Sequence, residues 1–134
     1  MPVKAFIDTN VVIYALGPAS TKTPLAAPLF LGTPSISTQV LSEAANVAAK
    51  KLAMPTGEIR KLLLTLESLC RVEVIVSATL HLALEIVERY GFSWYDSLIV
   101  ATALEAGCDM LYTEDLQAGQ VIEGRLTITN PFLG

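Results

Sequence analysis

Four acidic side chains stand beside four separate segments of this sequence. Asp8 and Asp115 follow short apolar runs, whereas Glu43 and Asp96 lie near the starts of two segments with helical periodicity. Two ionised carboxylates in close contact repel by about 3–4 kcal/mol at an effective dielectric constant near 20. If the four acids converge, either cations hold them together or some of them are protonated. The pattern therefore indicates a magnesium or manganese site, and with it phosphate chemistry.

Each of these acids also has an ordinary structural interpretation. Asp8 suits a turn or a helix N-cap, and Glu43 borders the apolar stripe of a helix, where most carboxylates face solvent. Asp96 completes a capping box with Ser93, and the positive end of the helix dipole would also keep it ionised and favour a metal. Taken singly these alternatives stay open, but three aspartates and one glutamate beside separate elements are a less ordinary set.

The loop that carries Asp115 offers a second acid, Glu114. Consecutive loop residues rarely point in the same direction, so we expect only one of the two to enter the site, and we choose Asp115. Thr113 would orient a ligand through its hydroxyl, and Asn10, two residues after Asp8, is a further polar accessory.

The elements that must position these acids alternate along the chain. Strands are predicted at residues 3–7, 35–37, 72–76, 110–112 and 125–129, and helices at 10–16, 25–31, 38–52, 55–69, 77–90 and 94–106. Strands that alternate with helices predict a parallel sheet covered on both faces. In such sheets, sites form beyond the carboxyl ends of the strands where the strand order reverses. If the strands before Asp8 and Asp115 are neighbours, both acids border that crevice.

Composition limits the class of protein. The 134 residues fit one domain, 1–134, with one core. Hydrophobic residues make up 52% and charged residues 16% of the chain, so we expect some apolar surface to be buried in a homodimer. No segment predicts a membrane span or a signal peptide. Cys70 and Cys108 lack metal-ligand spacing, which is typical of reduced thiols in a cytoplasmic protein.

The net charge of −4 argues weakly against a general nucleic-acid-binding surface. Outside the four candidate acids, however, the remaining nine of the 13 acidic residues balance the nine lysines and arginines. Two divalent ions would bring the occupied protein near neutrality. Four basic residues on two successive predicted helices are candidates for contacts with RNA phosphates, although a solvated helical face is the more ordinary explanation; they are Lys50, Lys51, Arg60 and Lys61.

The segments that contain the four acids resemble a known family when taken as a set. They are residues 6–10 (FIDTN), 39–43 (QVLSE), 95–99 (YDSLI) and 112–115 (YTED), and they are similar to the four motifs of PIN-domain ribonucleases, above all the toxin subunits of VapBC-type toxin–antitoxin pairs. The resemblance covers nearly the whole chain in the right order. Many relatives have Asn in place of one of the last acids, whereas Asp115 is present here.

This resemblance implies a fold and an activity. The fold is a three-layer α/β/α sandwich with a central five-stranded parallel sheet in the order 3-2-1-4-5. The activity is Mg²⁺- or Mn²⁺-dependent endonucleolytic cleavage of RNA, with one or two ions, in a homodimer that a small antitoxin protein inhibits. Carried over by position, the acidic catalytic and metal site consists of Asp8, Glu43, Asp96 and Asp115.

Other functions are poorer predictions. His81 is the only histidine, which excludes a two-histidine acid–base pair. Ser42 and Cys70 have no evident histidine base, so a nucleophilic triad is a poor prediction as well. An aspartyl-phosphate hydrolase with Asp8 as nucleophile commonly needs an acid two residues later, where this chain has Asn10. The main alternative is a protein-binding module whose acidic pocket is not catalytic and which acts through its apolar surface.

Overall fold

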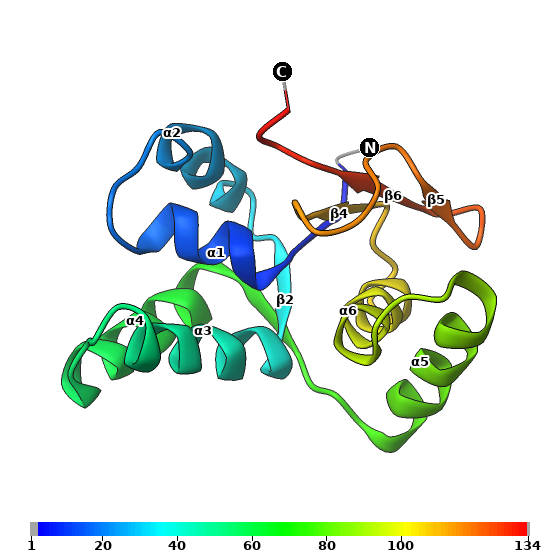
Figure 1. Cartoon of the computed structure of the whole chain (residues 1–134), viewed down its shortest axis with the longest axis horizontal. Coiled ribbons are helices and arrows are strands. Elements are labelled where there is room, and N and C mark those ends of the chain that lie inside the picture. Colours follow the sequence, from blue (N-terminus) through cyan, green and yellow to red (C-terminus); the bar gives the residue numbers. More distant parts are fainter. Residues whose placement is uncertain (1–2, 134) are drawn as a thin grey trace.

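The computed structural model describes residues 3–133, which form a six-stranded sheet between helices (Figure 1). The strands are β1 (Ala5–Ile7), β2 (Ser35–Ser37), β3 (Arg71–Glu73), β4 (Met110–Tyr112), β5 (Val121–Ile122) and β6 (Leu126–Thr129). Their order in the sheet is β3-β2-β1-β4-β6-β5. The first five pair in parallel, whereas β5 pairs with β6 antiparallel.

The predicted α/β sandwich is confirmed, with one correction to its sheet. The parallel strands β3, β2, β1, β4 and β6 follow the expected order 3-2-1-4-5. The expectation of five strands is wrong because β5 adds a sixth at the edge. That strand has only two residues and is held by a tight turn to β6, so it carries no periodicity that sequence alone would show.

Helices cover both faces of this sheet. They are α1 (Thr9–Leu16), α2 (Thr23–Ala26), the 3₁₀ turn η1 (Ala27–Phe30), α3 (Thr38–Lys50), α4 (Thr56–Leu69), α5 (Ser77–Tyr90) and α6 (Trp94–Glu105). In Figure 1, α1 to α4 lie on one side of the sheet and α5 and α6 on the other. This division follows from right-handed crossovers, because the chain moves from β1 to β3 in one direction and then returns to add β4.

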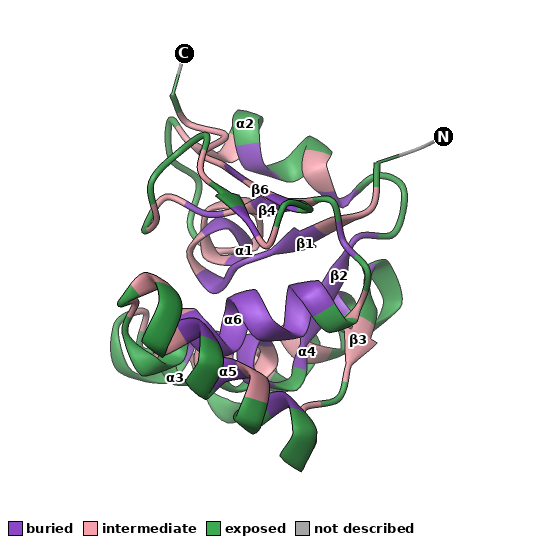
Figure 2. Ribbon diagram, turned by 90° about the vertical axis from the view of Figure 1, so that its right-hand side faces the viewer, coloured by how far each residue is buried: buried purple, intermediate pink, exposed green. Residues whose placement is uncertain are grey.

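Burial explains why these short strands hold together. Phe6 and Ile7 of β1 and Leu111 of β4 are fully buried, as expected for central parallel strands that are apolar on both faces. Every residue of α6 from Ser97 to Leu104 is buried as well, and Figure 2 shows this helix inside the molecule rather than at its surface. Because α6 is buried, it holds Asp96, the acid in its first turn, in a fixed position.

The topology brings the candidate acids to one edge of the sheet. β1 pairs with both β2 and β4, and Ile7 aligns with Tyr112. The strand order therefore reverses at β1, and the residues that follow β1 and β4 emerge side by side, as predicted for an open parallel sheet. The backbone N–H of Asp8 donates to the carbonyl of Tyr112 at 3.0 Å, which fixes this junction.

Candidate metal centre

Three aspartates from distant parts of the chain converge beyond the carboxyl ends of β1 and β4. Asp8 follows β1, Asp96 lies in the first turn of α6, and Asp115 lies in the loop after β4. Each offers a carboxylate oxygen within 4.8 Å of the other two. Over residues 3–133, no lysine or arginine forms an ion pair with any of the three. Their mutual repulsion is therefore not relieved by a protein cation.

Asp8 is the most buried member of this trio. One of its carboxylate oxygens accepts the backbone N–H of Thr9 at 2.7 Å, as the N-cap of α1, and the other accepts the hydroxyl of Thr113 at 2.8 Å. Burial is the largest influence on the carboxyl group and raises its pKa from 3.8 to about 6, although these two hydrogen bonds act in the opposite direction. Asp8 therefore serves as the N-cap of α1 and is also a member of the aspartate trio.

Asp96 sits at the positive end of the buried helix α6. Its backbone N–H donates to the Oγ of Ser93, the N-cap residue, at 3.2 Å, so the predicted cap is confirmed. Partial burial raises the pKa of the Asp96 carboxyl, and the nearby charges of Asp115 and Glu43 add to that rise, while a hydrogen bond with Ser93 opposes it. A cation between the aspartates would reverse these effects.

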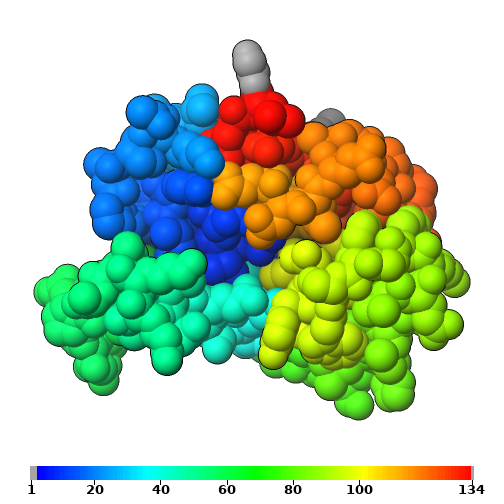
Figure 3. Space-filling view, in the orientation of Figure 1, coloured from blue at the N-terminus to red at the C-terminus, as the bar shows by residue number. Residues whose placement is uncertain are grey.

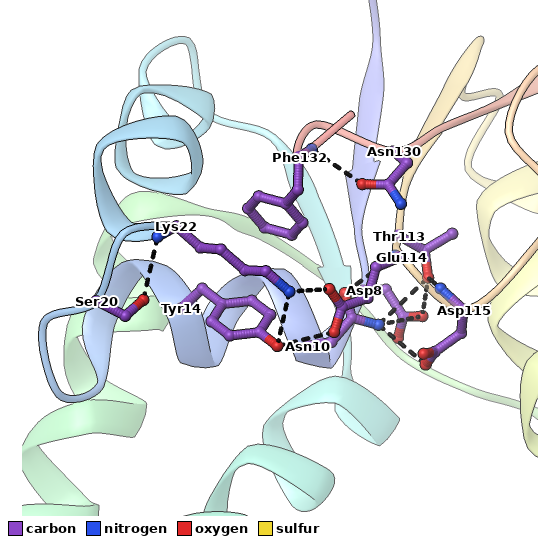
Figure 4. A network of polar contacts seen from close by, with 10 residues as sticks. All are labelled: Asp8, Asn10, Tyr14, Ser20, Lys22, Thr113, Glu114, Asp115, Asn130 and Phe132. Carbon is purple, nitrogen blue, oxygen red and sulfur yellow. Dashed lines mark hydrogen bonds and ion pairs between the residues drawn. The ribbon is translucent and has the colours of Figure 1, made fainter. Parts of the chain in front are cut away.

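Asn10 and Thr113 connect Asp8 to Asp115 (Figure 4). The side-chain amide of Asn10 donates to Asp115 at 3.0 Å and lies 3.3 Å from the Thr113 hydroxyl. The hydroxyl of Thr113 in turn accepts the backbone N–H of Asp115 at 3.1 Å. Both residues were predicted as polar accessories, and the structure places them between two of the aspartates.

Glu43 borders the trio without being one of its members. Its carboxylate accepts the hydroxyl of Thr9 at 2.7 Å and the side-chain amide of Gln39 at 3.3 Å. Gln39 also donates to the backbone carbonyl of Tyr95, so it bridges α3 and the start of α6. Neither partner of Glu43 is among the residues predicted to contact it. Gln39 precedes Glu43 by one helical turn, which is a signal that was available, whereas the contact with Thr9 depends on tertiary structure.

Glu114 is turned to partners other than the aspartates. Its carboxylate accepts the hydroxyl of Tyr14 at 2.9 Å and forms an ion pair with Lys22 at 2.7 Å. Although burial alone would raise it, the pKa of Glu114 is lowered, because the hydrogen bonds from Lys22 and Tyr14 outweigh that effect. The sequence leaves open whether Glu114 or Asp115 enters the site. In the structure Asp115 lies with Asp8 and Asp96, whereas Glu114 is paired with Lys22.

The aspartates lie in a cleft of about 910 Å³. Segments of α1, α3, the start of α6 and the loop after β4 line it, and in Figure 3 these blue, cyan, yellow and orange regions adjoin on the face shown. Of the four basic residues predicted to contact RNA, Lys51 lines the cleft. The other three are exposed on α3 and α4 and are not among the residues that line it: Lys50, Arg60 and Lys61.

The donor set fits a hard divalent cation. Mg²⁺ binds oxygen ligands at about 2.0–2.1 Å, so two oxygens on opposite sides of the ion are about 4.2 Å apart. The upper limit of 4.8 Å among the aspartate oxygens is close to that span. The cleft offers carboxylates, and among the described residues that line it there is no histidine or cysteine, which favours Mg²⁺ or Mn²⁺ over softer metals.

The fold and the cleft define an α/β protein with an acidic centre at the switch point of its sheet. The PIN domain family matches residues 5–122, and the chain therefore belongs to the PIN domain family. No curated protein matches the sequence. None of the helices over residues 3–133 has both the length and the apolar character that crossing a membrane requires.

Solved structures with the same fold include several proteins from toxin–antitoxin systems. A chain of a toxin–antitoxin complex from Klebsiella pneumoniae is 21% identical, covers 96% of this chain and 98% of its own length, and superposes with a TM-score of 0.74. DNA-bound VapBC from Salmonella typhimurium gives 22% identity, coverage of 95% and 98%, and a TM-score of 0.69. VapC20 from Mycobacterium tuberculosis is described as a sarcin–ricin-loop-cleaving toxin. It is 16% identical, covers 84% of this chain and 90% of its own length, and superposes with a TM-score of 0.65.

Proposed function

We propose that this protein is a divalent-metal-dependent endoribonuclease and the toxin component of a toxin–antitoxin pair. The observation that carries the proposal is the convergence of Asp8, Asp96 and Asp115, free of ion pairs with lysine or arginine over residues 3–133. Membership in the PIN domain family supports nuclease activity. The fold shared with VapC20 and with chains of VapBC complexes supports the role in a toxin–antitoxin pair.

Asp8, Asp96 and Asp115 would hold one or two Mg²⁺ or Mn²⁺ ions. When bound, such ions lower the pKa of water and neutralise charge that develops on phosphate oxygens. Asp8, fixed at both oxygens by Thr9 and Thr113, sets the position of the centre. Asp115 is kept in place through Asn10.

Glu43 would orient the attacking water. Thr9 and Gln39 hold its carboxylate at the border of the aspartate trio, where it lines the same cleft. A carboxylate accepts hydrogen bonds, and it accepts a proton from a water that is being activated. Attack by water rather than by the ribose 2′-hydroxyl would leave a 5′-phosphate and a 3′-hydroxyl.

RNA would lie along the cleft across the aspartate trio. Lys51 lines the cleft and would contact a phosphate, and Tyr95, which is 63% exposed beside Asp96, offers a surface on which a base can stack. Stacking of this kind needs an unpaired base, so a single-stranded segment suits the cleft better than a regular duplex.

Protein partners are the second part of this proposal. Apolar side chains are exposed on α5 and in the segment before it, and they suit a contact with a second subunit or a small antitoxin; they are Val74, Val76, Leu80 and Leu84. We place the protein in the cytoplasm, where its two buried free cysteines would stay reduced. These apolar side chains are also the observation that favours the alternative function, a non-catalytic protein-binding module.

Incubation of the purified protein with total RNA separates the two functions. We expect cleavage in the presence of Mn²⁺, loss of cleavage in EDTA, and fragments that carry 5′-phosphates. We also expect Mn²⁺ to raise the melting temperature, because a ligand bound by the native state stabilises it. Fragments that form equally in EDTA would contradict the metal-dependent mechanism, and a protein that neither cleaves RNA nor responds to Mn²⁺ would support the binding module.

A further inference from the structure

A cluster of four side chains beside the cleft is not used by the proposed chemistry. It consists of Tyr14, Lys22, Glu114 and Phe132, here called the Lys22 cluster (Figure 4). The Lys22 ammonium lies 4.4 Å from the centre of the Tyr14 ring and 5.1 Å from that of Phe132. It donates to Glu114 at 2.7 Å and to the Tyr14 hydroxyl at 3.2 Å. Cation–π and charge-assisted contacts therefore act on one ammonium group together.

The Lys22 cluster joins parts of the chain that are far apart in sequence. Lys22 precedes α2, Tyr14 belongs to α1, and Phe132 belongs to the segment after β6. The two aromatic rings meet edge to face with centroids 5.1 Å apart. Glu114 stands between two residues of the candidate metal centre, Thr113 and Asp115. Through Glu114, the cluster is thus attached to the loop that carries a metal-site aspartate.

The loop after β4 is also attached to the start of α1, through Asn10. The side-chain oxygen of Asn10 accepts the backbone N–H of Glu114 at 3.3 Å, while its amide donates to Asp115 at 3.0 Å. The side chain of Glu114 is held by Lys22 and Tyr14. Side-chain contacts therefore fix each of the three consecutive loop residues, Thr113, Glu114 and Asp115. Freed from those partners, Glu114 would be one more carboxylate able to turn toward the cleft that it already lines.

We propose that Lys22 and Tyr14 are positioning residues, which keep Glu114 away from the metal and thereby hold Asp115 in the geometry that binds it. The inference rests on the proposed metal-dependent function. Charge alone does not explain the arrangement, because a lysine placed only to offset negative charge would need neither the Tyr14 hydroxyl nor two aromatic rings close to its ammonium. The paired hydrogen bonds define where the Glu114 carboxylate points.

Variants that keep the net charge of the chain test this idea. Tyr14→Phe removes one hydroxyl, and the double variant Lys22→Met with Glu114→Gln removes the ion pair as a unit. A second cluster supplies matched controls, since Arg89 pairs with Glu123, which also accepts the Tyr90 hydroxyl at 2.8 Å, away from the cleft. The control variants are Tyr90→Phe and Arg89→Met with Glu123→Gln.

Two readouts are needed. The first is the Mn²⁺ dissociation constant, measured by calorimetry without RNA, which we expect to rise about tenfold in the test variants because residues that orient metal ligands have effects of that size. Saturating Mn²⁺ should then restore cleavage to near the wild-type rate. The second is amide hydrogen exchange of Asp115 in the metal-free protein, which we expect to become about tenfold faster as the loop opens more often. The controls should leave both quantities unchanged.

Each outcome decides a separate point. Unchanged Mn²⁺ affinity in Tyr14→Phe and in the double variant would overturn the positioning role, even if exchange at Asp115 became faster. If the wild-type protein binds no Mn²⁺, the proposed function fails and the positioning role fails with it; if the wild type binds Mn²⁺ and the test variants bind it equally well, the positioning role alone fails. Equal weakening by the control variants would also overturn it, because a general loss of stability would then explain the effect.

Discussion

Replacing Asp8 by asparagine is expected to lower the rate of metal-dependent RNA cleavage by about a thousandfold while the protein stays folded. Asparagine keeps the size of the side chain and an oxygen for the Thr9 N–H, so the N-cap of α1 is preserved. It removes the negative charge at the most buried position of the aspartate trio. The loss of several kcal/mol of transition-state stabilisation corresponds to about a thousandfold in rate. Initial rates at fixed Mn²⁺ measure the effect.

The matched control is Asp109→Asn. Asp109 is exposed before β4, at the opposite end of the same strand from Asp115, and it accepts the backbone N–H of Lys4 at 3.1 Å. We expect this variant to cleave RNA at about the wild-type rate. Near-normal cleavage by Asp8→Asn, with a melting temperature like that of the wild type, would remove Asp8 from the mechanism.

Asp8 is expected to make the metal-free protein less stable as the pH rises from about 4 through about 6. Burial raises the pKa of Asp8 in the folded protein to about 6 from its ordinary value of 3.8. Between these values the folded state binds a proton that the unfolded state has lost, so the stabilisation present in acid disappears as the pH rises through the folded pKa. The difference corresponds to about 3 kcal/mol.

Other carboxyl groups respond in the opposite direction, Glu114 among them because its pKa is lowered. The measurement is therefore a difference: denaturant unfolding of the wild type and of Asp8→Asn at pH 4.5 and pH 7, both in EDTA. We expect the wild type to lose stability relative to the variant as the pH rises, and saturating Mn²⁺ at pH 7 to restore it. If the free energies of unfolding of the two proteins change equally between pH 4.5 and pH 7, ionisation of Asp8 does not destabilise the folded protein, and the prediction is wrong.

Sequence reasoning recovered the fold because the elements are bounded by strong local signals. Gly91 adopts the left-handed conformation that ends α5, with φ of 72°, and Ser93 caps α6 as its position predicts. It was less accurate where local signals compete. The third strand was predicted at 72–76 from its apolar residues but is Arg71–Glu73, because Ile75 and Val76 instead lead into α5, where the backbone of Val76 bonds to Thr79.

The candidate site was predictable only in part, for a physical reason. Parallel-strand topology places Asp8 and Asp115 at neighbouring strand ends, so their proximity follows from periodicity and connection rules. Which way Glu114 points does not follow from them, because its partner Lys22 is 92 residues distant in the sequence. The position of Glu43 outside the aspartate trio likewise depends on how α3 packs, which no local pattern encodes.

The central claim is that divalent ions hold Asp8, Asp96 and Asp115 together. A crystal of the protein grown with Mn²⁺ and measured at a wavelength where manganese scatters anomalously tests it most directly. We expect an anomalous peak between the three carboxylates that is absent from crystals grown in EDTA and from the Asp8→Asn variant. Well-ordered aspartates without a peak between them at saturating Mn²⁺, or manganese bound only elsewhere on the protein, would contradict the claim.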